Sequence, residues 1–138
     1  MAKTVVNPPA RPRPSGFSHG IVAQGRTLFL AGQTAQDGMG RIVASGDLVA
    51  QFRQALTNVL AVLAAGGGRP ADLVKVTIYV RDKRDYRARA KAIGQLYRQA
   101  LGGHYPATTL VEVRALWDDD ALIEIDGIAV VEEETTKQ

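Results

Sequence analysis

The chain contains no cysteine and very little histidine or serine. The absence of cysteine excludes disulfides, thiolate nucleophiles and cysteine-based zinc or iron–sulfur sites. Only two histidines and three serines occur, and no serine lies in a G-x-S-x-G motif, so a serine hydrolase has little support. His104 has no second metal ligand spaced with it, and we expect it at a pocket edge or on the surface. The sequence therefore predicts no metal site.

Long hydrophobic runs and a strong charge excess are also missing. The longest apolar stretch, residues 59–65, is much too short to span a bilayer, and no charged-then-apolar leader opens the chain. We therefore expect a cytoplasmic protein without membrane contact. Residues 16–131 carry 13 basic and 11 acidic side chains, a net charge of +2 that is too small to indicate a nucleic-acid partner.

The 138 residues are about right for one domain. Residues 1–15 contain four prolines and are predicted to be a flexible, Pro-rich arm. Residues 132–138 form a polar tail. The domain itself is expected over residues 16–131, where no linker or repeat interrupts the sequence.

The spacing of apolar residues predicts an α+β order of elements. Helical stripes run from Leu48 to Leu63, after the N-cap Asp47, and from Tyr86 to Leu101. Strands are expected at 20–23 and 27–31, as a hairpin around residues 24–25, and at 74–80, 108–114 and 122–131. Two helices can cover only one face of a five- or six-stranded mixed sheet. The other face meets water or another subunit, so we expect an oligomer.

The sharpest candidate acids are Glu124 and Asp126, which strand periodicity places on one face about 6.6 Å apart. Partial desolvation between apolar neighbours would raise a carboxyl pKa and suit it to proton transfer near neutrality. The alternative is a solvated face, or ion pairs with Arg114 or Lys75.

Three other clusters have simpler structural explanations. Basic residues between 81 and 98 resemble an RNA track but are also typical of the solvated side of an amphipathic helix, and no stacking aromatics accompany them. The glycines at 66–68 follow a helix and lack a Gly-Lys-Ser/Thr ending, which favours helix termination over a phosphate loop. The aspartates at 118–120 are expected at an exposed turn.

Four segments, "GFSHGIVAQGRTLFLAGQT", "DLVKVTIYVRD", "YPATTLVEV" and "ALIEIDGIAVV", resemble the Rid family of reactive intermediate deaminases. The family is also called YjgF or L-PSP endoribonuclease-like, and the similarity covers about residues 16–131. It implies a chorismate-mutase-like α+β fold and a homotrimer with ligand pockets between subunits. Archetypal members hydrolyse enamines and imines to ketoacids and ammonia without a cofactor.

The resemblance also implies a set of site residues. Glu124 matches the acid thought to position the attacking water, and Gly32 the glycine whose backbone amide faces the ligand. Phe17 replaces a tyrosine, and we expect Phe17, Thr108 and Leu110 to shape the substrate pocket. The main departure is Thr108, which replaces the arginine of P-A-R-S that holds the substrate carboxylate; the loss is about 1.5–3 kcal/mol of binding to an acid.

The first hypothesis is a Rid-like hydrolase of an imine or enamine that lacks the usual carboxylate anchor, with Glu124 as general base. The second is a non-catalytic trimer that binds a small metabolite or acts like a chaperone. The third, an endoribonuclease, rests on the basic helix alone. An arginine from elsewhere, for instance Arg26 or Arg114, could restore acid binding, and the sequence leaves this open.

Overall fold

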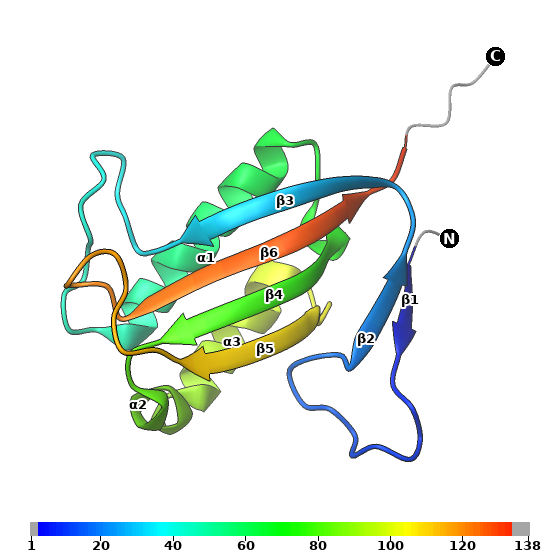
Figure 1. The fold of residues 1–138 in the computed structure, drawn as a ribbon, viewed down its shortest axis with the longest axis horizontal. Helices are drawn as coiled ribbons and strands as arrows, with labels where there is room; N and C mark the ends of the chain where they lie inside the picture. Colours follow the sequence, from blue (N-terminus) through cyan, green and yellow to red (C-terminus); the bar gives the residue numbers. More distant parts are fainter. Residues whose placement is uncertain (1–2, 134–138) are drawn as a thin grey trace.

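The computed structural model describes residues 3–133. In chain order its elements are β1 (Lys3–Val6), β2 (Gly20–Ala23), β3 (Arg26–Gln33), α1 (Leu48–Ala65), η1 (Pro70–Asp72), β4 (Leu73–Val80), α2 (Lys83–Ala88), α3 (Ala90–Leu101), β5 (Ala107–Glu112) and β6 (Ile123–Val131). Four strands form a mixed sheet in the order β3-β6-β4-β5, in which only β4 and β5 are parallel. The helices α1 and α3 cover one face of this sheet (Figure 1). The predicted α+β class and one-sided helical layer are confirmed.

The first predicted helix is the core helix of the domain. Asp47 caps α1 by accepting a hydrogen bond from the Ala50 N–H at 3.0 Å, and Gly66 ends the helix. By length and composition α1 could cross a membrane. Its apolar stripe instead packs against the sheet and includes Phe52 and Val59, both fully buried. A buried core helix passes the same length and hydropathy test.

The second helical stripe is not one helix but two. Arg89, with φ −100° and ψ 9°, separates α2 from α3. Asp82 caps α2 by accepting hydrogen bonds from the N–H groups of Arg84 and Asp85. The stripe nevertheless continues across the break, since Tyr86 packs against the same core as the buried residues of α3.

The predicted hairpin around residues 24–25 is wrong. β2 pairs with β1 and β3 pairs with β6, so the chain bends between β2 and β3 without folding back (Figure 1). Gly25 lies at this bend with φ +150°, and a Cβ there would meet the Val131 carbonyl oxygen. The six strands therefore form sheets of four and two, whereas the sequence predicted one sheet of five or six.

Part of the predicted N-terminal arm is a paired strand. Lys3–Val6 form β1, antiparallel to β2. The Lys3 ammonium also lies 2.9 Å from the Asp72 Oδ1 atom, which ties β1 to η1 across 69 residues of sequence. Of the predicted polar tail at 132–138, only residues 132 and 133 lie within the described range.

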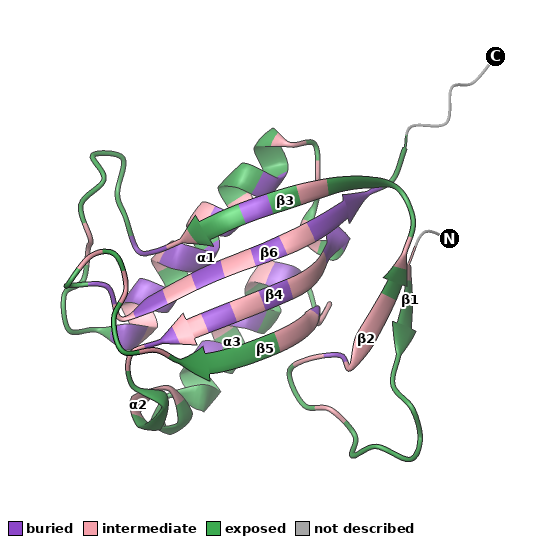
Figure 2. Cartoon of the chain, in the orientation of Figure 1, coloured by how far each residue is buried: buried purple, intermediate pink, exposed green. Residues whose placement is uncertain are grey.

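The strands β5 and β6 are not neighbours, because β4 lies between them. Burial alternates along β4 and β6, with fully buried side chains on the helix-covered face and partly buried ones on the open face (Figure 2). In this register Tyr79 lies opposite Glu124, and Thr77 lies opposite Asp126. The open face therefore carries the two predicted acids.

Candidate functional site

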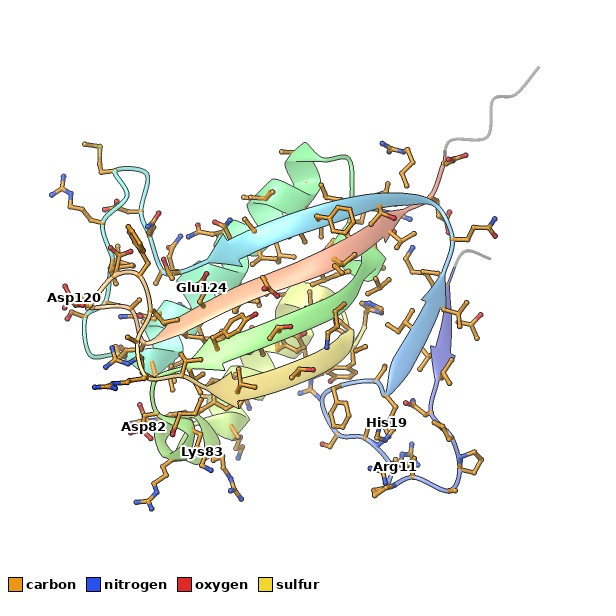
Figure 3. The ribbon with its side chains drawn as sticks, viewed as in Figure 1. Arg11, His19, Asp82, Lys83, Asp120 and Glu124 are labelled. Atoms are coloured by element: carbon orange, nitrogen blue, oxygen red, sulfur yellow. The ribbon has the colours of Figure 1, made fainter. Side chains whose placement is uncertain are left out.

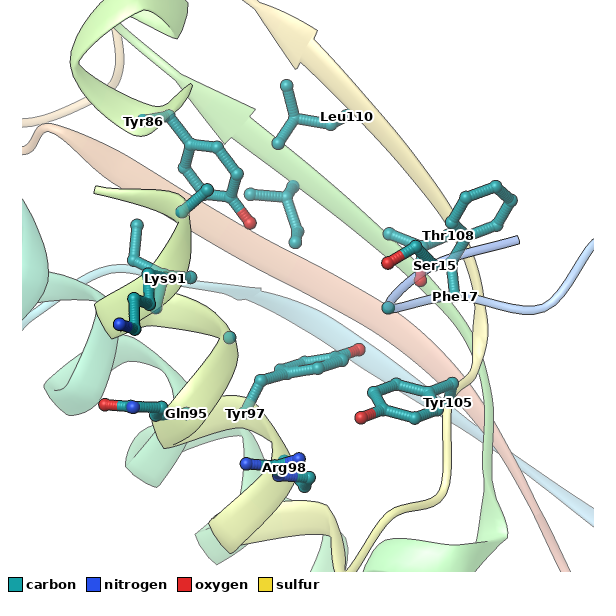
Figure 4. Close-up of a pocket in the computed structure, with 15 residues that line it drawn as sticks. Ser15, Phe17, Tyr86, Lys91, Gln95, Tyr97, Arg98, Tyr105, Thr108 and Leu110 are labelled. Atoms are coloured by element: carbon teal, nitrogen blue, oxygen red, sulfur yellow. The ribbon is translucent and has the colours of Figure 1, made fainter. Parts of the chain in front are cut away.

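A pocket of about 720 Å³ opens between α3, α2 and β5, on the helix-covered side of the sheet (Figure 4). This volume falls in the range of small-molecule sites. Aromatic and aliphatic side chains form most of its wall. Its lining includes Phe17, Tyr86, Lys91, Gly94, Tyr97, Arg98, Tyr105, Thr108 and Leu110.

The loop between β1 and β2 brings Phe17 to this pocket. The Ser18 N–H donates to the Pro106 carbonyl at 3.1 Å, and its hydroxyl donates to the Tyr105 carbonyl at 2.6 Å. Ser18 thereby forms a parallel bridge with Ala107 at the start of β5. Ser18 is almost fully buried, and its two hydrogen bonds hold the loop against the edge strand β5.

Thr108 presents no positive charge to the pocket. Its hydroxyl donates to the Pro106 carbonyl at 2.9 Å, which leaves only oxygen lone pairs for a ligand. Neither Arg26 nor Arg114 is among the lining residues. The basic side chains of the pocket are instead Lys91 and Arg98, both exposed on α3.

Two tyrosines of the pocket wall, Tyr86 and Tyr97, have phenol groups that are largely removed from water. Burial raises the pKa of Tyr86 to about 12. Burial also raises the pKa of Tyr97. The Tyr97 hydroxyl is buried and has no hydrogen-bond partner among the described residues. Both phenols are therefore neutral near pH 7.

Glu124 lies on the other face of the sheet, near one end of β6 and far from the loop that carries His19 (Figure 3). Gly32 on β3 approaches it so closely that a Cβ at position 32 would collide with the Glu124 carboxylate. The Tyr79 hydroxyl donates to the neighbouring Asp126 at 3.1 Å. These four residues form the open-face acid site: Gly32, Tyr79, Glu124 and Asp126.

Burial raises the pKa of Glu124, and the negative charge of Asp126 raises it further. Neither carboxylate belongs to an ion pair within residues 3–133. Lys75, a predicted alternative partner, donates to the Thr109 hydroxyl at 2.7 Å. A carboxylate with this environment is a better base near neutrality than an exposed one.

The structure thus divides the predicted site residues into two groups. Phe17, Thr108 and Leu110 line the pocket, whereas Gly32 and Glu124 belong to the open-face acid site. Sequence reasoning assigned the tyrosines of the helical stripe to the core and missed their place in the pocket wall. A signal for the pocket was present in the sequence: these positions carry tyrosine, although leucine or phenylalanine would be enough for packing in the core.

The other polar clusters have structural roles. The His104 Nε2 atom lies 2.6 Å from the Leu73 carbonyl oxygen, which fixes the turn after α3. Asp118 accepts a hydrogen bond from Gln36 at 3.3 Å and so links two loops. Among the described residues, no group of three or more His, Cys, Asp or Glu side chains could hold a metal ion.

Comparisons with known proteins identify the family. The family model for Endoribonuclease L-PSP matches residues 9–131. A RutC family protein of Pyrococcus horikoshii is 37% identical over 130 residues, which cover 94% of this chain and 99% of that protein. A 2-iminobutanoate/2-iminopropanoate deaminase of Salmonella typhimurium is 35% identical, with 94% and 98% covered.

Solved structures agree with the sequence relatives. A crystal structure from Yersinia pestis, described as YyfB of the conserved Rid protein family, is 37% identical and superposes with a TM-score of 0.85. The superposition covers 95% of this chain and all of the other. Sequence, fold and matched family model together show that this chain belongs to the Rid family, the family of Endoribonuclease L-PSP.

Proposed function

We propose that the protein hydrolyses imines or enamines that lack a carboxylate anchor, with Glu124 as the general base. The observation that carries this proposal is the Glu124 carboxylate itself, which is partly buried, has a raised pKa and forms no ion pair within residues 3–133. Support also comes from relatives in Salmonella typhimurium, Dermatophagoides farinae and Capra hircus that are named 2-iminobutanoate/2-iminopropanoate deaminases.

The reaction adds one water across a C=N bond. Ionised Glu124 takes a proton from this water, whose oxygen attacks the imine carbon to give a carbinolamine. Glu124 returns this proton to the nitrogen, which completes the neutral carbinolamine. It then takes the proton of the carbinolamine hydroxyl and passes it to the amino group, so that the C–N bond breaks, ammonia leaves and the C=O bond forms. Gly32 lies against the Glu124 carboxylate, and the resemblance to the family implies that its backbone N–H would hold the polar end of the substrate.

The division of the site between two faces requires more than one copy of the chain. We propose a homotrimer in which the open-face acid site of one copy meets the pocket of the next. Exposed apolar side chains on the open face support this assembly: Phe29 on β3 is 75% exposed and Val111 on β5 is 38% exposed. Apolar groups on a helix-free sheet face are typical of a subunit interface.

The test measures ammonia release from imines generated in situ by an amine oxidase or amino-acid oxidase. Wild type should accelerate hydrolysis of at least one neutral imine, and Glu124→Gln should lower its kcat by about 100-fold or more. The matched control is Asp119→Asn, which removes an exposed carboxylate in the turn before β6. If Glu124→Gln equals wild type on every imine turned over, the mechanism is wrong.

One observation favours a non-catalytic binding trimer as the second candidate: Glu124 does not line the pocket of its own chain. A binding protein would be stabilised against heat by ligands that it leaves chemically unchanged. Thermal-shift screening combined with product analysis separates the two functions. An endoribonuclease activity rests only on exposed basic residues of α2 and α3, and we do not propose it.

A further inference from the structure

The wall of the pocket is built from aromatic rings. Tyr97 and Tyr105 lie with ring centroids 6.4 Å apart and planes tilted by 31°. Tyr86 faces them across the cavity, and Phe17 and Leu110 lie on the β5 side (Figure 4). Aromatic walls of this kind favour a flat ligand that stacks on or against their faces.

Gly94 keeps one side of the pocket open. It lies in the middle of α3, where glycine costs about 1 kcal/mol relative to alanine. A Cβ at this position would meet nothing within 4 Å, so packing within the chain does not require glycine. The residue lines the pocket. The absence of a side chain at Gly94 enlarges the cavity and lowers the stability of the helix.

The Tyr97 hydroxyl is a second, independent sign of a ligand. Tyr97 is only 6% exposed, and its hydroxyl has no partner within residues 3–133. An unpaired buried hydroxyl costs about 1–3 kcal/mol, which phenylalanine would avoid with the same ring. A ligand with a hydrogen-bond acceptor would satisfy the hydroxyl after a small movement of the ring.

The interior of the pocket suits an uncharged group. The Thr108 hydroxyl donates to Pro106, and a neutral hydroxyl binds a carboxylate more weakly than a guanidinium does. The two neighbouring cations, Lys91 and Arg98, are exposed on α3 and are screened by water. A carboxylate inside the pocket would face tyrosine rings and oxygen lone pairs. These groups do not offset the free-energy cost of removing the carboxylate from water.

We propose that the substrate carries a flat, uncharged ring that enters this pocket beside Gly94 and accepts a hydrogen bond from Tyr97. This inference rests on the proposed function, since it names the substrate class of the same site. The reacting C=N group lies at the open end of the pocket, where the acid site of the next copy reaches it. The substrates are imines that carry an uncharged aryl or heteroaryl ring, and small imino acids are excluded.

The test uses stable ketones, the products of such imines, as binding probes. Phenylacetone, phenylpyruvate and 2-oxobutanoate present a neutral ring, the same ring with a carboxylate, and a carboxylate without a ring. We expect phenylacetone to bind at least tenfold more tightly than 2-oxobutanoate in calorimetry, and phenylpyruvate to bind no more tightly than phenylacetone. Equal or tighter binding of 2-oxobutanoate would overturn the proposal.

Two variants locate the ring. Gly94→Leu should weaken phenylacetone binding at least tenfold, because the new side chain would occupy part of the pocket. The fold should persist, because a Cβ at this position meets no other atom of the chain within 4 Å. Its matched control is Ala92→Leu, an exposed residue of α3 outside the pocket lining. Tyr97→Phe should raise Tm and should remove the binding advantage of 4-methoxyphenylacetone, whose ring oxygen can accept a hydrogen bond from Tyr97, over phenylacetone, whose ring has no acceptor. A merely structural tyrosine would not give this combination. Unchanged binding in Gly94→Leu would also overturn the proposal.

The binding assay is independent of hydrolysis, so the two proposals fail separately. If phenylacetone binds as expected but its imine is not hydrolysed, the proposed function fails and the ring pocket stands. If the imine of butanone, which is neutral and has no ring, is hydrolysed while the imine of phenylacetone is not, the ring pocket fails and the hydrolase stands.

Discussion

Two carboxylates and one phenol determine the acid–base behaviour of the open face. The Tyr79 hydroxyl donates to Asp126 at 3.1 Å and lies on the strand next to Glu124. Burial is the larger cause of the raised pKa of Glu124, and Asp126 is the smaller one. The pKa of Tyr79 is raised mainly by its hydrogen bond to Asp126, so this phenol donates and does not ionise near neutrality.

The first prediction concerns Asp126→Asn, which removes a negative charge from the neighbourhood of Glu124. The pKa of Glu124 should fall, because an ionised Glu124 is then less strongly repelled. Since the base acts in its ionised form, the acidic limb of the kcat/KM profile should move to lower pH. A pH–rate profile measures this shift, with Asp119→Asn as the unshifted control. A limb that moves to higher pH would contradict the assignment of Glu124 as the base.

Single residues were predictable where their role depends on local periodicity. The period of two correctly placed Glu124 and Asp126 on one face, as the strand register shows. The sequence could not show which tyrosines of a buried stripe also face a cavity. Tyr97 is both a core residue and a pocket residue, and only the packing of α3 beside β5 distinguishes these roles.

Elements were predictable where their end signals are local. Asp47 and Gly66 begin and end α1 as expected. The bend between β2 and β3 was not predictable from Gly25 alone, because the same glycine suits a hairpin. Strand pairing decides the outcome. β3 pairs with β6 and β2 pairs with β1, so β2 and β3 do not pair with each other.

The second prediction concerns the attachment of β1. Burial alone would raise the pKa of Asp72, but the hydrogen bonds from Lys3 and from the Arg69 N–H outweigh this effect and lower it. Lys3→Ala leaves a carboxylate that is only 3% exposed without its cation. The free energy of unfolding should fall by about 1–3 kcal/mol at pH 7.

The pH dependence of the cost of Lys3→Ala follows from the direction of the pKa shift of Asp72, which is downward. A carboxyl group with a lowered pKa in the folded state stabilises the fold above its unfolded pKa, and the stabilisation is lost as pH falls through the folded value. Urea unfolding should therefore show the cost of Lys3→Ala shrinking from pH 7 towards strongly acidic pH. Lys83→Ala, an exposed lysine outside any described ion pair, is the control. A cost that stays constant with pH would show that the ion pair contributes nothing.

At the scale of the whole molecule, the two halves of the proposed site lie on opposite faces of the sheet of one chain. The helix side offers the pocket with Thr108, and the open face offers Glu124. The sequence predicted both the uncovered face and the oligomer, because two helices cannot cover both faces of the sheet. It could not show that the pocket and the acid are separated, since the pocket forms between α3 and β5 only in the folded chain, and Glu124 is not among its lining residues.

The last prediction tests whether the two halves meet between copies. Glu124→Gln removes the acid, and Thr108→Trp fills the pocket from an edge strand that tolerates a large aromatic residue. Each variant alone should be inactive. If the site is shared in a ring of three, a 1:1 mixture unfolded and refolded together should regain roughly a quarter of wild-type ammonia release, because about one interface in four joins an intact acid to an intact pocket. If each chain built its site alone, the mixture would stay inactive, since no subunit carries both groups. Mixing the two variants without unfolding is the control, and it should regain activity only as fast as subunits exchange.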